Sequence, residues 1–335
     1  MMYRHQYVER ETGKVRTETI YADRLVRVLY SHAREHAPVL FRALTSRRVS
    51  GLLGFLNYDL AIGARITGGT RFLRRLGVDL SECLDDPQEL DTVRKIFERR
   101  IRYWECRPMP EDPRVVVSPA DARLLVGSFA QASALYLKDK FFDYEELLGR
   151  DRRRWLDAFH NGDWALLRLT PDKYHYNHCP VSGQVEDHYE IPGPYHSCNP
   201  SAVVTMATPF SKNRRVITVI DTDVPGGTGV GRVAMVEVVA LMIGEVVQCY
   251  SENGYAQPRG VEPGMFLLRG APKSLYRPGS STDVVLFQRE RVRFDADLLR
   301  NRAQDQVVSR YSLGFDALLA ETDVRVRSSI ARPIS

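Results

Sequence analysis

The chain has 335 residues, of which 44% are hydrophobic and 27% charged, and 47 basic against 42 acidic residues give a net charge of +5. This length allows about two domains with sizeable cores. The composition excludes collagen-like, disordered and disulfide-scaffold proteins. The longest apolar run, Val233–Ile243, contains Glu237 and falls short of the roughly 20 apolar residues that a membrane-crossing helix needs.

The first ten residues carry charges where a secretory signal would need an apolar centre. The five cysteines are widely spaced and form no CxxC pair, which is typical of reduced thiols. We therefore expect a cytoplasmic location, with peripheral contact to a membrane as the alternative. The mild positive charge favours an anionic membrane surface and does not indicate a nucleic-acid binder.

The first hundred residues carry apolar side chains at three- and four-residue spacings among arginines, which predicts helices. The clearest segments are 23–29, 37–44 and 71–76. We interpret the arginines as a solvated helix face, with docking on a membrane as the alternative. The proline cluster Pro108–Pro113 cannot continue a helix and predicts a domain boundary near residue 110.

Beyond residue 110 the chain consists of short apolar runs bounded by Gly, Pro, Asn or Asp, which predict strands. These runs are 115–117, 164–169, 202–206, 215–220 and 283–287. The stretch 232–250 is ambiguous, with strand favoured over helix. The glycine-rich segment 225–231 matches no phosphate-binding motif and is interpreted as a turn. The predicted fold class is α+β, a helical N-terminal region (1–110) followed by a mainly β domain (111–335).

Half of the eight histidines lie close together in the sequence, near two cysteines. They are His175, His178, His188 and His196, near Cys179 and Cys198. Imidazole and thiolate are zinc ligands. However, His175 and His178 belong to an alternating segment that ends at a proline, and residues three apart on a strand point to opposite faces. We therefore predict no metal, and each histidine alone could be a structural imidazole.

Three separated segments resemble, in order, motifs of the phosphatidylserine decarboxylase family, whose members cut themselves at a serine and convert it to a pyruvoyl group. The segments are Val117–Asp121, Leu169–Gly183 and Gly279–Thr282. They are similar to the family's Ser-Pro-x-Asp-Gly, Tyr-His-x-x-His-x-Pro and Leu-Gly-Ser-Thr motifs. The likeness covers residues 111 to 320. The N-terminal region is similar to an extension in a branch that includes a fungal aromatic amino-acid decarboxylase.

Two departures from the family pattern affect the predicted site. Ala122 stands where the family has glycine, and the cleavage motif carries one additional residue. Counting back from Phe287 makes Ser281 the reactive serine, whereas counting forward from Tyr276 makes it Ser280. We prefer Ser281 because it leads into the strand without a gap.

The resemblance implies a self-processing, pyruvoyl-dependent carboxy-lyase. A serine becomes nucleophilic when an imidazole oriented by a carboxylate takes its proton, and Asp121, His178 and Ser281 supply this set. The pyruvoyl cofactor would derive from Ser281, or from Ser280 under the alternative count. A β chain (1–280) and an α chain (281–335) would stay associated. His175 is a further catalytic candidate, and whether His175 or His178 donates the proton to the product stays open.

The leading functional hypothesis is the conversion of phosphatidylserine to phosphatidylethanolamine with release of CO₂. A second hypothesis is a soluble enzyme that decarboxylates a free amino acid, for example an aromatic one. A third is an uncleaved, non-catalytic binding module of the same fold. The predicted partners are the phospholipid or amino-acid substrate and, under the first hypothesis, a membrane surface. Nucleic acid is not among them, and a homodimer stays open.

Overall fold

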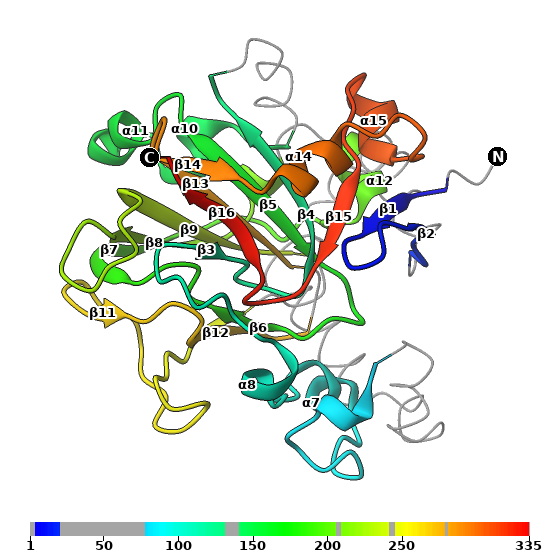
Figure 1. The fold of residues 1–335 in the computed structure, drawn as a ribbon, viewed down its shortest axis with the longest axis horizontal. Coiled ribbons are helices and arrows are strands. Elements are labelled where there is room, and N and C mark those ends of the chain that lie inside the picture. Colours follow the sequence, from blue (N-terminus) through cyan, green and yellow to red (C-terminus); the bar gives the residue numbers. More distant parts are fainter. Residues whose placement is uncertain are drawn as a thin grey trace.

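A computed structural model describes residues 4–20, 78–130, 141–205, 209–240, 245–278 and 281–334. A ten-stranded sheet forms its centre, with the order β11-β7-β8-β9-β13-β5-β4-β15-β1-β2 (Figure 1). Its strands are β1 (Gln6–Glu9), β2 (Val15–Thr17), β4 (Ala122–Ser128), β5 (Asp163–Leu169), β7 (Gly183–Ile191), β8 (Arg215–Asp221), β9 (Arg232–Val239), β11 (Phe266–Leu267), β13 (Ser281–Phe287) and β15 (Glu321–Val324). The neighbours pair antiparallel except β1 and β15.

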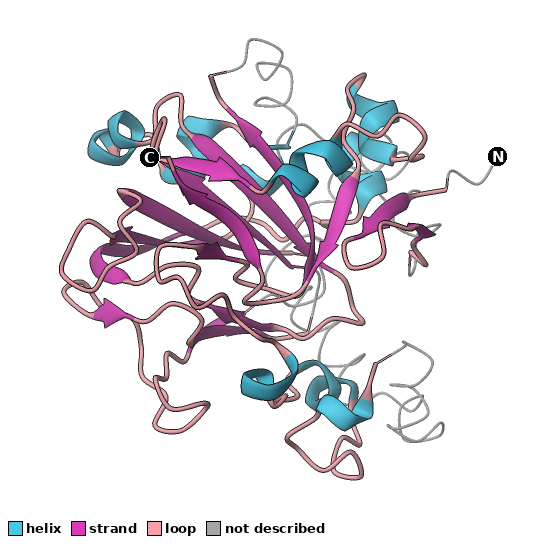
Figure 2. Ribbon diagram, in the orientation of Figure 1, coloured by secondary structure: helices cyan, strands magenta, loops and turns pink. Residues whose placement is uncertain are grey.

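Two three-stranded sheets and several short helices complete the described fold (Figure 2). One small sheet contains β10 (Val246–Gln248), β12 (Pro272–Tyr276) and β6 (Tyr176–His178), and the other β14 (Val292–Phe294), β16 (Ser329–Pro333) and β3 (Val116–Val117). The helices are η3 (Leu80–Glu82), α7 (Val93–Phe97), α8 (Tyr103–Cys106), α10 (Tyr144–Leu148), α11 (Arg153–Ala158), α12 (Pro200–Thr205), α13 (Pro209–Lys212), α14 (Ala296–Arg302) and α15 (Arg310–Phe315). The α+β prediction, with a mainly β domain, is confirmed. Among the described residues, no helix has the length and apolar character to span a membrane.

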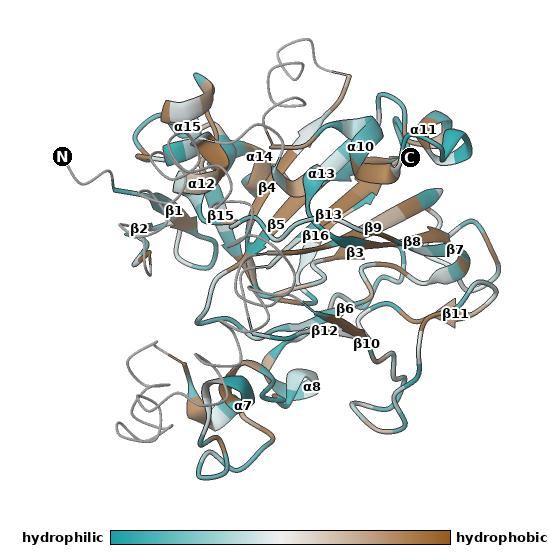
Figure 3. Ribbon diagram, turned by 180° about the vertical axis from the view of Figure 1, so that it is seen from behind, coloured by the Kyte–Doolittle hydropathy of each residue, from teal (hydrophilic) through white to brown (hydrophobic). Residues whose placement is uncertain are grey.

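Strand β13 lies in the middle of the large sheet, and all its residues are buried. Successive side chains of a strand point to opposite faces. Val284 and Leu286 accordingly pack into a core with the helices α10, α11 and α15, whereas Val285 and Phe287 pack into a second core on the other face. The apolar central strands stand out in Figure 3. Burial on both faces explains why this run is continuously apolar apart from its first three residues.

The N-terminal region differs from the all-helical prediction. Strands β1 and β2 join the edge of the large sheet, where β1 pairs with β15 near the other end of the chain. Val8 is fully buried between polar neighbours, which is the alternation of a half-buried strand. The short helices α7 and α8 do lie in this region. The predicted helices 23–29, 37–44 and 71–76 lie outside the described residues.

The strand predicted for 202–206 is wrong over its described part, which belongs to helix α12. Pro200 stands at the first helical position, and the Asn199 side chain accepts a hydrogen bond from the Ser201 amide at 2.8 Å. These start signals outweigh the strand preference of the valines. The strands predicted within 115–117, 164–169, 215–220 and 283–287 are confirmed. The ambiguous stretch contains β9 and β10, and the glycine-rich segment is the turn between β8 and β9.

Candidate active site

Two of the predicted site residues, Asp121 and Ser281, lie at one end of the large sheet, whereas His175 and His178 belong to the small sheet of β6 and its approach. Arg168 of β5 pairs with Thr282 of β13 on one side and with Arg123 of β4 on the other, so these residues form one row across three strands. Ser281 precedes Thr282, and Asp121 lies two residues before Arg123. Because both β4 and β13 run antiparallel to β5, Asp121 and Ser281 lie at the same end of the sheet.

Ser281 opens strand β13 and is buried, with an exposed fraction of 2%. Its Oγ atom has no hydrogen-bond partner among the described residues. A buried hydroxyl is normally hydrogen-bonded, so an unpartnered one needs an explanation. The hydroxyl of Ser281 is thus not held by any described residue. The alternative serine, Ser280, lies outside the described residues together with Gly279.

His178 ends strand β6 and is fully buried. Its Nδ1 atom lies 2.8 Å from the Gly270 carbonyl oxygen, which can only accept, so Nδ1 carries a proton. Burial lowers the pKa of His178 to about 3, and the ring is neutral at pH 7. Nε2 is therefore the basic nitrogen, and it accepts from the Tyr174 hydroxyl at 3.0 Å. Tyr174 in turn lies 2.8 Å from the hydroxyl of Tyr255.

His175 lies just before β6 and is also fully buried. Neither ring nitrogen has a hydrogen-bond partner of good geometry among the described residues, and the ring packs on Phe97 with centroids 4.6 Å apart. Burial lowers its pKa to about 3, against the opposing effect of the Lys173 backbone. The His175 carbonyl accepts from the Tyr276 amide at 3.0 Å, which ties it to the strand that precedes the cleavage motif.

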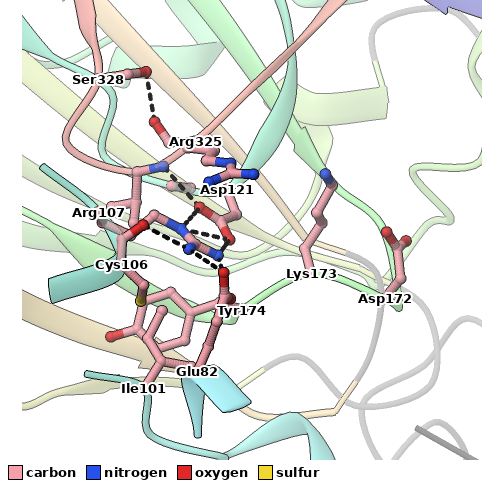
Figure 4. A network of polar contacts seen from close by, with 12 residues as sticks. Glu82, Ile101, Cys106, Arg107, Asp121, Asp172, Lys173, Tyr174, Arg325 and Ser328 are labelled. Atoms are coloured by element: carbon pink, nitrogen blue, oxygen red, sulfur yellow. Dashed lines mark hydrogen bonds and ion pairs between the residues drawn. The ribbon is translucent and has the colours of Figure 1, made fainter. Parts of the chain in front are cut away.

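Asp121 is held by an ion pair that the sequence did not predict (Figure 4). Arg107 donates to Asp121 Oδ2 at 2.8 Å, and the Val326 amide donates to Oδ1 at 2.8 Å. On its other side Arg107 binds Glu82. Burial disfavours the charged form of Asp121, but Arg107 outweighs this effect and lowers the pKa of the carboxyl. Asp121 is thus an anion, and it makes no hydrogen bond to His178 within the described structure.

A buried ion pair lies on the strands beside Ser281. Lys273 of β12 and Glu237 of β9 are both fully buried and lie 2.7 Å apart. Glu237 stands directly opposite Asp283 of β13, and burial together with this neighbouring carboxylate raises the pKa of Asp283 well above its usual range. Both effects favour the neutral form of Asp283. The sequence signal for these groups is an acidic residue inside each of two apolar strands.

The remaining histidines of the predicted cluster, His188 and His196, make hydrogen bonds to other elements of the fold. The His188 ring bonds Thr218 at 3.0 Å within the large sheet, and the His196 amide bonds Asn213. The described residues do contain one set of possible metal ligands elsewhere, namely His5, Glu18 and Glu321. Arg168 binds both of these carboxylates, at 2.6 and 2.7 Å, so this cluster is an ion-pair network.

Comparison with known proteins matches this chain to one family. A family model described as phosphatidylserine decarboxylase matches residues 93–308. Phosphatidylserine decarboxylase proenzyme 2 of rice is 33% identical over 231 residues, 68% of this chain but 34% of the rice protein. The phosphatidylserine decarboxylase proenzyme of Chlamydia trachomatis serovar D is 31% identical over 303 residues, 89% of this chain and 92% of its own length. That of Fusobacterium nucleatum is 25% identical over 310 residues, 92% and 95% of the two chains.

Proposed function

Because the chain belongs to the phosphatidylserine decarboxylase family, we propose that it converts phosphatidylserine to phosphatidylethanolamine and CO₂ after cutting itself before Ser281. The relatives are named proenzymes, a term for chains that mature by cleavage. The observation that carries the proposal is the buried, unpartnered hydroxyl of Ser281 at the end of the sheet where Asp121 also lies.

Self-cleavage starts when the Ser281 hydroxyl attacks the carbonyl of residue 280 and gives its proton to a base. His178 is the proposed base, since the Gly270 carbonyl fixes the tautomer in which Nε2 carries no proton. Burial and the nearby charge of Arg327 disfavour the resulting imidazolium, whereas the Gly270 carbonyl and the negative charge of Asp121 favour it. The acyl group moves from nitrogen to oxygen, and the amide nitrogen takes the proton.

The ester then loses the α-proton of residue 281 and expels the carboxylate of residue 280. The dehydroalanine left at position 281 adds water and releases ammonia, which yields the pyruvoyl group. The buried position of Ser281 fits this group, because its side-chain oxygen is not held by any other described residue. A pyruvoyl group supplies a ketone that condenses with the substrate amine and accepts the electron pair left by CO₂.

Two buried histidines are our candidates for donating and accepting protons in the reaction. His175 is our proposed donor of the proton that replaces CO₂, because neither of its ring nitrogens has a hydrogen-bond partner of good geometry among the described residues. Behind His178 lie the hydroxyl groups of Tyr174 and Tyr255, and the Tyr255 hydroxyl also donates to the Ile101 carbonyl at 2.9 Å. Tyr255 lines a surface pocket with Trp104.

We also propose how the two cleaved chains are held together and where the protein acts. The β chain (1–280) and the α chain (281–335) stay together because β13 hydrogen-bonds to β5 on one side and β9 on the other. The boundary near residue 110 stays a prediction, as does a homodimer. We also propose peripheral contact with anionic lipid, since the substrate is a membrane lipid and each basic residue near such a surface contributes about 1 kcal/mol.

The substrate is tested by incubating the purified protein with vesicles that contain carboxyl-labelled phosphatidylserine and by measuring labelled CO₂. We expect release from the vesicles, none from the Ser281→Ala variant, and co-sedimentation of the protein with the vesicles. Free serine, tyrosine and tryptophan are tested in parallel. Release of CO₂ from a free amino acid but not from the vesicles would show that the amino acid, and not the lipid, is the substrate. An uncut, inactive protein would support the binding-module hypothesis.

A further inference from the structure

A hydrogen-bonded contact connects the two sides of the cleavage segment. Residues 277–280 separate Tyr276, the last residue of β12, from Ser281, the first of β13. The fully buried Tyr276 hydroxyl lies 3.1 Å from the Thr282 carbonyl oxygen and 2.7 Å from Asp283 Oδ1. One tyrosine from the upstream strand therefore contacts both the backbone and a side chain immediately downstream of the predicted cut.

Whether the Tyr276 hydroxyl can donate to the Thr282 carbonyl depends on whether the Asp283 carboxyl is protonated. A phenol has one proton, so it cannot donate to the Thr282 carbonyl and to a carboxylate at once. A neutral Asp283 instead donates its own proton to the phenol oxygen, which leaves the phenol proton for Thr282. Burial and the opposite Glu237 favour this neutral form by raising the pKa of Asp283. Burial likewise raises the pKa of Tyr276, which keeps its proton.

The surroundings leave Asp283 available for this contact. Glu237, the nearest carboxylate in register, is already bonded to Lys273 at 2.7 Å, to Gln248 at 2.9 Å and to Ser274. Asp283 Oδ2 has no partner among the described residues. The Tyr276 hydroxyl is therefore the polar group that holds the Asp283 side chain in the described structure.

We propose that the contact between Tyr276 and Asp283 positions Ser281 for self-cleavage and afterwards holds the start of the α chain on the β chain. Ser281 and Asp283 are two residues apart on one strand, so their side chains share a face. The bonds at Thr282 and Asp283 restrict the backbone next to the attacking hydroxyl. This inference rests on the proposed self-cleavage, in which a misplacement of about 1 Å costs on the order of 10²-fold in rate.

The test follows cleavage during cell-free synthesis, with a radioactive pulse and measurement of uncut chain against time. Tyr276→Phe and Asp283→Val are expected to cleave at least about tenfold more slowly than the wild type. Asp283→Asn is expected to cleave close to the wild-type rate, because its amide donates to the phenol as the neutral acid does. Tyr189→Phe is the matched control, since it also removes a buried hydroxyl that bonds one carbonyl, 2.8 Å away in Leu148.

The variants separate positioning from stability. Slow cleavage in Tyr189→Phe as well, or no recovery in Asp283→Asn, would assign the effect to general destabilisation and overturn the positioning role. Wild-type cleavage in Tyr276→Phe would also overturn it, while the proposed function would stand. If Tyr276→Phe does not fold, the cleavage rates of Asp283→Asn and Asp283→Val are compared instead. Equal rates of these two variants would overturn the positioning role. A wild-type chain that never cuts itself would instead refute the proposed function.

Discussion

Replacement of Ser281 by alanine is expected to leave the 335-residue chain uncut, whereas Ser280→Ala still cuts itself. The alanine removes the hydroxyl that is proposed to attack the preceding carbonyl, so the expected loss of cleavage is complete and not a slowing. The fold should tolerate the change, because Ser281 Oγ makes no hydrogen bond in the described structure. Gel electrophoresis under denaturing conditions, followed by intact-mass analysis, measures the fraction cut.

The paired serine variants also decide which of the two residues reacts. Cleavage that persists in Ser281→Ala but is lost in Ser280→Ala would move the nucleophile to Ser280 and contradict our assignment. The His178→Ala variant is tested in the same way, and we expect it to stay uncut as well because it lacks the proposed base. Melting temperatures of all three variants close to the wild-type value would exclude unfolding as the cause.

Lys273→Met is expected to lower the free energy of unfolding by about 3–5 kcal/mol, because it leaves Glu237 buried without its cation. Both partners are fully buried, and Glu237 would then face Asp283 across the sheet with no compensating charge. Urea denaturation measures the change. The Ser281→Ala background keeps the protein a single chain, so that unfolding can be treated as one transition.

Two further variants test whether the loss comes from an unpaired buried charge. Lys273→Met combined with Glu237→Gln removes both charges and should recover most of the stability. Lys95→Met breaks an exposed ion pair with Asp91, 2.8 Å long and with both side chains more than half exposed, and should cost less than about 1 kcal/mol. A loss in Lys273→Met as small as that in Lys95→Met would contradict a structural role for the buried pair.

The sequence predicts secondary structure best where the local pattern of apolar residues agrees with their burial in the fold. Strands β5, β8 and β13 are apolar runs buried on both faces, and their pattern was sufficient. In α12 the valines favoured a strand, but the Asn199 cap and the packing of Val204 against Gly314 of α15 determine a helix. Strand β1 has only four residues and pairs with β15 near the other end of the chain, and the three-residue β2 pairs with β1, so neither strand's place in the sheet follows from the local sequence.

For the site, the sequence motifs identify the residues but not their partners. Ser281, His178 and Asp121 were found because each belongs to a motif segment. Arg107 appeared only as one arginine among many, because its role depends on a contact with Asp121 that the fold creates. Tyr276 and Asp283 flank a recognised motif, yet their bond could not be predicted, because it depends on a contact between the ends of two strands that belong to different sheets.

Intact-mass spectrometry of the purified wild-type protein tests the central claim most directly. Our account predicts two chains, residues 1–280 and 281–335, the second lighter than a serine-initiated chain by the mass of one ammonia and resistant to Edman degradation. The measurement is made under denaturing, reducing conditions, so that associated chains separate. A single uncut chain of 335 residues would contradict self-processing and with it the proposed pyruvoyl chemistry.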